Sequence, residues 1–70
     1  MNEEFISDPT QILQLAFDQH GSRLIQNILE SDNEEKKTFV FKILLPKSNF
    51  LMKDKFGNYV FQKMFEKSLP

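Results

Sequence analysis

The 70-residue chain contains no cysteine and no tryptophan, and it has only two glycines. Without cysteine it can form neither a disulfide nor a thiolate metal site, and its single histidine, His20, has no second histidine with which to share a metal ion. A formal net charge of −1 gives no general attraction to phosphate or to anionic lipid. The longest apolar run, 38–45, is interrupted by Lys42, so we expect no membrane span. We also expect no secretory signal, because residues 1–7 carry two acids and no base.

The two glycines mark a stretch that the chain contains twice. Residues 20–30 read HGSRLIQNILE, and residues 56–66 read FGNYVFQKMFE. Aligning Gly21 with Gly57 superimposes the two copies without a gap, at an offset of 36 residues. A fixed period between about 20 and 50 residues is the signature of a repeat array.

Each copy has the pattern of an amphipathic helix. At roughly 100° per residue, the apolar side chains fall in one arc and the polar side chains in the opposite arc. The inward positions are Leu24, Ile25, Ile28 and Leu29 in the first copy, and Val60, Phe61, Met64 and Phe65 in the second. The outward positions are Ser22, Arg23, Gln26, Asn27 and Glu30, and then Asn58, Tyr59, Gln62, Lys63 and Glu66. A solvated face usually carries Lys and Glu, but both of these faces present a short hydrogen-bonding residue, a Gln one turn later, and a planar Arg or Tyr beside them.

Capping residues predict a helix on either side of the first copy. Asp8 before Pro9 is typical of a helix start, because the aspartate caps the first turn and the proline has no N–H to leave unpaired. Ser31 and Glu34 have the spacing of a capping box for a helix after the first copy, and Pro46 marks its end. The apolar stripe of that helix is Phe39, Val40, Ile43 and Leu44.

The second unit starts directly after this proline. A short helix is predicted over 48–52, with Phe50 and Leu51 inward and Met52 at a core position, followed by the second central helix over 56–67. We therefore expect an all-α chain of five helices with the two central helices parallel and side by side.

The repeat also predicts the domain organisation. It consists of a tail, 1–7, a complete three-helix unit, 8–45, and a second unit, 46–70, that lacks its third helix. Because solenoid units bury their faces only against neighbours, the C-terminal end is expected to be an apolar edge. Its residues are Phe61, Met64 and Phe65, and we expect it to support self-association or further units.

The stretches HGSRLIQ and FGNYVFQ, 36 residues apart in three-helix units, resemble the Pumilio (PUF) RNA-binding repeats, in particular the first two of the usual eight. The resemblance implies a right-handed α-solenoid whose central helices line a concave face and bind single-stranded RNA, one base per repeat. It also implies sequence-specific binding to the 3′ untranslated regions of mRNA, a role in post-transcriptional regulation such as translational repression, and a cytoplasmic location.

The resemblance assigns roles to six outward residues. In the first repeat, Ser22 and Gln26 match the pair that reads a base edge, and Arg23 matches the residue that stacks on bases. In the second repeat, Asn58 and Gln62 match the edge-reading pair and Tyr59 the stacking residue. In the family, Ser with Gln is similar to the adenine reader and Asn with Gln to the uracil reader, and the RNA runs antiparallel to the protein. The expected target is therefore 5′-UA-3′.

The other candidate sites have simpler explanations. His20 aligns with Phe56, so we expect it to be a packing residue at a helix entry. Asp18 and Asp54 recur at equivalent repeat positions, which is typical of caps, since the members of an acid–base pair must converge in one site. The two glycines fit no phosphate-binding pattern, and we expect each to form a tight turn.

Two classes of function remain open, and a third is disfavoured. The first is an RNA-binding segment of a longer array. The second is a helical-repeat surface that binds protein, in which case substituting the edge-reading residues would leave partner binding intact. An enzyme is disfavoured because no nucleophile, base or metal-ligand set converges, so we expect no catalysis, no metal and no cofactor.

Overall fold

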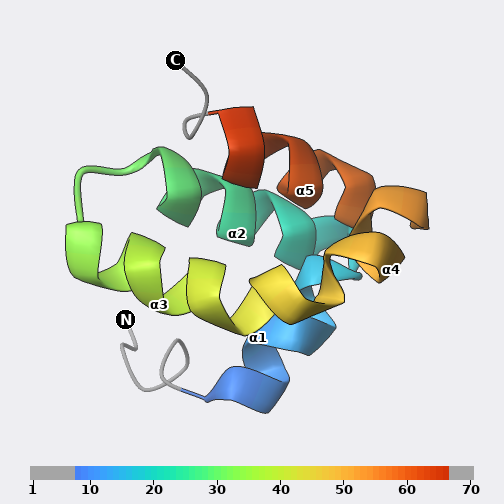
Figure 1. Cartoon of the computed structure of the whole chain (residues 1–70), viewed down its shortest axis with the longest axis horizontal. Helices are drawn as coiled ribbons and strands as arrows, with labels where there is room; N and C mark the ends of the chain where they lie inside the picture. Colours follow the sequence, from blue (N-terminus) through green and yellow to red (C-terminus); the bar gives the residue numbers. More distant parts are fainter. Residues whose placement is uncertain (1–7, 67–70) are drawn as a thin grey trace.

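The computed structural model describes residues 8–66, and the predicted tail, 1–7, and the last positions, 67–70, lie outside this range. Within it the chain is all-α, as predicted, with five α-helices, one short 3-10 helix and no strand. In chain order the elements are α1 (Pro9–Ala16), α2 (Gln19–Glu30), α3 (Glu34–Leu44), η2 (Leu45–Lys47), α4 (Ser48–Lys53) and α5 (Gly57–Glu66), as drawn in Figure 1. None of these helices has the length and apolarity needed to cross a membrane.

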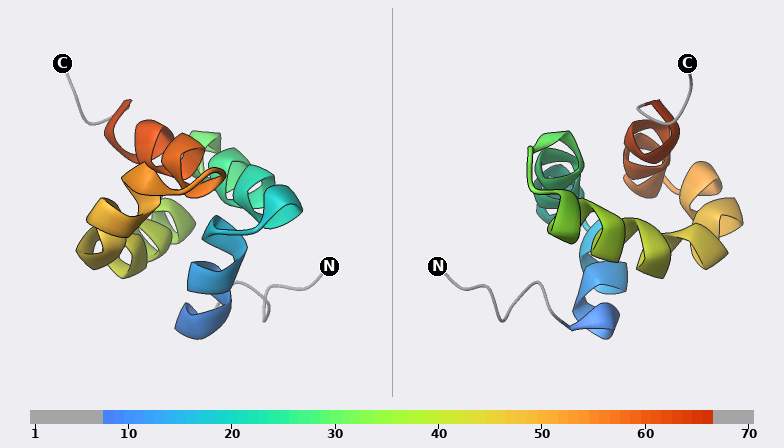
Figure 2. Two further views of the ribbon diagram at one scale, coloured as in Figure 1. Left: turned by 90° about the vertical axis from the view of Figure 1, so that its right-hand side faces the viewer. Right: turned by 60° about the vertical axis from the view of Figure 1, so that its left-hand side comes forward.

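The two units repeat in space as they do in the sequence. At the offset of 36 residues, α4 corresponds to α1 and α5 to α2. α2 and α5 pack side by side and run in the same direction, as their colours show in Figure 1. Figure 2 shows these two helices together on one side of the molecule, with α1, α3 and α4 on the other side. The predicted parallel pair of central helices is therefore confirmed.

A single apolar core joins the two sides. Its buried members are Ile12, Ala16, Ile25, Leu29, Val40, Leu44, Leu51, Val60 and Met64. They come from all five α-helices, because each helix turns one arc toward the same interior. Burying one such large side chain contributes about 1.5–3 kcal/mol. Packing of these arcs therefore stabilises helices that would be too short to persist alone in water.

Aspartate side chains start three of the helices. Asp8 Oδ1 accepts a hydrogen bond of 3.0 Å from the backbone N–H two residues later, and Pro9 occupies the first turn of α1, as predicted. Asp18 Oδ2 accepts from the N–H groups two and three residues later, at 3.0 and 2.7 Å. Asp54 Oδ2 does the same at 2.9 and 2.7 Å. Both acids are therefore caps, and the repeat extends to individual hydrogen bonds.

The glycine near the start of each central helix permits a close approach between helices. Neither glycine has a positive φ, so the predicted tight-turn role is wrong. A Cβ added to Gly21 would lie 2.6 Å from the backbone oxygen of Leu15 and 2.7 Å from its Cα. A Cβ on Gly57 would lie 3.0 Å from Leu51 Cδ2 and 3.2 Å from the Leu51 Cα. The missing side chain therefore lets each central helix contact the helix before it.

The predicted capping box of α3 is wrong. The cap is Asn33, whose Oδ1 accepts a 3.0 Å hydrogen bond from the Lys36 N–H. Ser31 instead closes the end of α2, where its Oγ donates to the Ile28 carbonyl at 2.7 Å. Since α3 begins at Glu34, its cap is the residue directly before it, and Ser31 lies too early in the chain.

Several predicted burial states are also wrong. Leu24 is 43% exposed, whereas Val60 at the equivalent position is fully buried. The difference arises because α5 packs on α2, while no described element covers the corresponding side of α2. Phe50 and Met52 of α4 were expected inside but are 62% and 49% exposed. The predicted inward position of Met64, by contrast, is confirmed, because only 2% of this residue is exposed.

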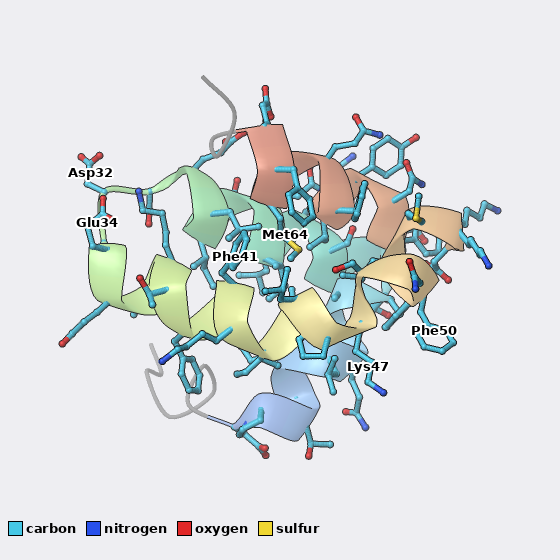
Figure 3. All side chains as sticks on the ribbon, in the orientation of Figure 1. Asp32, Glu34, Phe41, Lys47, Phe50 and Met64 are labelled. Atoms are coloured by element: carbon cyan, nitrogen blue, oxygen red, sulfur yellow. The ribbon has the colours of Figure 1, made fainter. Side chains whose placement is uncertain are left out.

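Aromatic rings gather where α3 meets the end of α5. The Phe65 ring centroid lies 4.9 Å from that of Phe61 and 5.8 Å from that of Phe41. All three side chains are half-buried. We call these three residues the aromatic edge; Figure 3 shows its Phe41 close to Met64.

Candidate functional site

The outward surfaces of α2 and α5 enclose a hollow of about 540 Å³, which we call the central hollow. Its lining residues are Gln19, Ser22, Arg23, Gln26, Asn27, Glu30, Phe56 and Tyr59. Four of the six predicted site residues are among them, and they come from both repeats. The packing of α2 against α5 therefore converts the polar faces of two sequence repeats into one continuous surface.

The planar side chains of Arg23 and Tyr59 lie on this same surface, as the repeat predicted. Both are exposed, and Tyr59 retains 54% of its accessible area. A guanidinium and a phenol ring each offer a flat face to an aromatic base. Each of the two repeats therefore contributes one exposed planar side chain to the central hollow.

Gln26 supplies the central hollow with an uncommitted amide. Its side chain is half-buried and makes no hydrogen bond with any other residue of 8–66. A glutamine amide carries donor N–H groups and an acceptor oxygen. Gln26 can therefore form two complementary hydrogen bonds with a planar ligand that enters between the helices.

Ser22 lies deeper than the sequence predicted. It was placed on the outward face, but only 3% of it is exposed, and its Oγ lies 3.4 Å from the Gln19 carbonyl, to which it donates. The first turn of α2 approaches α1 closely at Gly21, so the adjacent serine is largely covered. Ser22 still lines the central hollow, where it offers a small surface with little free hydrogen-bonding capacity.

Asn58 and Gln62 form a connected pair on α5, outside the lining of the central hollow. Asn58 Nδ2 donates to the carbonyls of Asp54 and Lys55 at 2.8 and 2.9 Å. Gln62 Nε2 in turn donates to Asn58 Oδ1 at 3.1 Å. These hydrogen bonds hold the side chains of Asn58 and Gln62 against α5, whereas the Gln26 amide on α2 has no such partner within residues 8–66.

Lys63 ties the far ends of the two central helices together. Its Nζ pairs with Glu30 of α2 and lies 3.4 Å from Glu66 Oε1 on its own helix. The hydrogen bond with Glu30 raises the pKa of Lys63. The Glu30 carboxylate at this end of the central hollow is therefore compensated by a cation.

Sequence reasoning missed some of the lining residues of this surface. Asn27 and Glu30 were predicted on the outward face but were given no role. Gln19 lies one helical turn before Arg23, so helical spacing could have identified Gln19 as a lining residue. Phe56 carries no such signal, because its position depends on how α5 packs on α2. His20, its equivalent, is exposed, so the predicted packing role is wrong.

Comparison with known proteins agrees with the repeat geometry. The family model for the Pumilio-family RNA binding repeat matches residues 11–45 and 50–70. Pumilio homolog 1 of Xenopus laevis is 47% identical over 55 residues, which is 79% of this chain and 5% of that protein. The mRNA-binding protein puf3 of Schizosaccharomyces pombe is 46% identical over 56 residues, 79% of this chain and 8% of that protein. Pumilio homolog 12 of Arabidopsis thaliana is 38% identical over 56 residues, 80% of this chain and 9% of that protein. No solved structure matches the chain significantly.

Proposed function

The chain belongs to the Pumilio family of RNA-binding repeats, and we propose that it binds single-stranded RNA sequence-specifically, with one base read by each repeat. The observation that carries the proposal is the central hollow, in which the uncommitted amide of Gln26 lies with two planar side chains, Arg23 and Tyr59. A base stacked on these planar groups would present its edge to Gln26. Stacking gives affinity for any base, and the amide selects among edges.

Adenine is the proposed ligand of the first repeat. Its edge combines an N–H donor with a ring-nitrogen acceptor, which complements the acceptor and donor of the Gln26 amide. Ser22 is nearly buried, so it is proposed to act by its small size at the base edge more than by a strong hydrogen bond.

Uracil is the proposed ligand of the second repeat. The hydrogen bonds from Asn58 Nδ2 to two backbone carbonyls leave its Oδ1 directed toward Gln62. The two amides together present acceptors and a remaining N–H, which can pair with the N–H and carbonyls of uracil. The resulting target for the two repeats is 5′-UA-3′.

Two bases are too few for strong binding by the chain alone. Stacking contributes about 1–3 kcal/mol per base, or about 2–6 kcal/mol for two, before the cost of association. Once that cost is subtracted, the remaining free energy corresponds to millimolar affinity or weaker, and a net charge of −1 adds little counterion release. Useful affinity is therefore proposed to require further repeats. In that setting the expected targets are 3′ untranslated regions of cytoplasmic mRNA, with post-transcriptional regulation, and not catalysis, as the outcome.

The test places residues 8–66 in a complete Pumilio array in exchange for the five equivalent helices of its first two repeats, so that the array keeps its own third helix of the second repeat. Ser22→Asn should move the preference at the final base from A toward U, because the new amide can reach the carbonyls of Asp18 and Gln19, as Asn58 reaches the equivalent ones. The reciprocal change, Asn58→Ser, should move the preceding base from U toward A.

Competition binding with the four variants at each position measures both preferences. Lys42→Ala, an exposed change on α3, is the matched control and should alter neither. If the preference for A persists in Ser22→Asn while the array still binds, Ser22 and Gln26 do not read the base.

A further inference from the structure

A second hollow lies between the end of α1 and α4, on a part of the molecule that the RNA proposal does not use. This outer hollow has a volume of about 440 Å³ and is lined by Leu13, Phe17, Lys47, Phe50, Lys53 and Asp54. It shares no lining residue with the central hollow. Figure 3 shows Lys47 and Phe50 projecting on the same side of the molecule, beside α1.

The outer hollow has an apolar lining with an exposed aromatic ring beside it. Leu13 and Phe17 of the first unit are half-buried and pack against the core. Phe50 of α4 is 62% exposed, the largest exposure among the large apolar side chains of 8–66. Such a side chain loses its unfavourable contact with water when a second apolar group covers it. The hollow is therefore suited to hold one large apolar side chain.

The charged groups around this hollow favour an anionic partner. Within residues 8–66, neither Lys47 nor Lys53 forms an ion pair with an acid. The Lys47 ammonium instead lies 5.6 Å from the centre of the Phe50 ring. Asp54 is the one acid of the lining, and its Oδ2 already accepts two backbone N–H groups. Two exposed cations therefore flank the apolar lining, with one committed carboxylate.

We propose that the outer hollow binds a short acidic segment of a partner protein. In this complex an aromatic or large aliphatic side chain of the segment packs on Leu13, Phe17 and Phe50, and neighbouring carboxylates face Lys47 and Lys53. The lining favours peptide over RNA because it offers no amide or hydroxyl side chain that could pair with a base edge. The apolar contact supplies most of the affinity, and the charges select acidic over basic flanks.

The test follows the amide signals of the isotopically labelled chain by NMR during titration with three capped pentapeptides. Their sequences are Glu-Glu-Phe-Glu-Glu, Lys-Lys-Phe-Lys-Lys and Glu-Glu-Ala-Glu-Glu. The first should shift the signals of Leu13, Lys47, Phe50 and Lys53. The other two should bind about tenfold more weakly or less well still, because each lacks one of the two recognised features.

Exposed-residue variants separate this site from a general surface effect. Phe50→Ala should weaken binding of the first peptide about tenfold, as should the double change Lys47→Glu with Lys53→Glu. Lys42→Glu on α3 is the control, because it makes the same change of charge at one exposed residue outside the outer hollow, and it should leave binding of the first peptide unchanged. Circular dichroism of each variant verifies that the helices are retained.

Three results would overturn the proposal. They are equal binding of the three peptides, binding that survives both sets of variants, and no binding of the first peptide. A uridine oligonucleotide that shifts the same four signals at lower concentration than the first peptide would also overturn it, and would identify a nucleic-acid site instead.

Discussion

Replacing Gly21 with alanine tests whether the close approach of α2 to α1 shapes the first repeat. The added Cβ would lie 2.6 Å from the Leu15 backbone oxygen and 2.7 Å from its Cα, so the two helices would have to move apart. At Gly57 the nearest atom is Leu51 Cδ2 at 3.0 Å, the end of a flexible side chain, and the Leu51 Cα is 3.2 Å away. The same substitution should therefore be better tolerated in the second repeat.

The expected magnitudes follow from two opposing effects. Overpacking an interface costs about 1–3 kcal/mol, and exchanging glycine for alanine in a helix returns about 0.5–1 kcal/mol. Gly21→Ala should therefore lower the free energy of unfolding by about 0.5–2 kcal/mol, and Gly57→Ala should change it by less than about 0.5 kcal/mol. For a domain of this size, 1 kcal/mol corresponds to about 4–8 °C in Tm. The Tm of Gly21→Ala should thus fall by about 2–16 °C.

Urea and thermal unfolding followed by far-UV circular dichroism provide the measurement. The two variants control for each other, because both remove a glycine at an equivalent repeat position and both add one methyl group. A Gly57→Ala chain that loses as much stability as Gly21→Ala, or more, would refute the reasoning from close approach. Unchanged stability in both variants would refute it as well.

Three further outcomes are expected. Asp18→Ala and Asp54→Ala each remove the acceptor of two backbone N–H groups, and each should cost about 0.5–2 kcal/mol in urea unfolding; no loss would contradict their capping role. Ile25→Ala should lower the free energy of unfolding by about 2–5 kcal/mol, because Ile25 is fully buried. Leu24→Ala should lower it much less, because Leu24 is 43% exposed. Equal losses of stability in the two variants would be inconsistent with this packing. The isolated chain should unfold below about 60 °C or self-associate through the aromatic edge. Circular dichroism measures the unfolding transition and sedimentation measures the association. A sharp transition above about 60 °C that dilution does not change would contradict both expectations.

Recurring residues made the helices predictable from sequence. Asp18 and Asp54 cap the central helices of their repeats, and Gly21 and Gly57 each lie where the central helix approaches the preceding helix closely. The same residue types recur because the two repeats have the same local structure. The cap of α3 was not predictable in this way. Several short polar residues precede that helix, and only the observed start of the helix selects Asn33.

Burial was less predictable, because it depends on neighbouring units that helical periodicity does not contain. Leu24 and Val60 share one motif position and have opposite exposures. In the candidate site, too, some features follow from helical spacing and others depend on packing. Helical spacing places Arg23 and Gln26 on one face, but the contribution of Phe56 requires the packing of α5 on α2. The hydrogen bond between Asn58 and Gln62 requires side-chain conformations that no motif specifies.

The position of Tyr59 provides a spectroscopic probe. It is the one tyrosine of the chain, and there is no tryptophan, so the intrinsic ultraviolet emission comes almost entirely from this phenol. Tyr59 is 54% exposed and lines the central hollow. An aromatic ligand stacked on the ring, or water removed from it, would alter the emission. Ligand binding in the central hollow can therefore be followed by the tyrosine fluorescence of the unmodified chain, with no dye attached. The fluorescence of the Arg23→Ala variant can be compared with that of the unmodified chain under the same conditions.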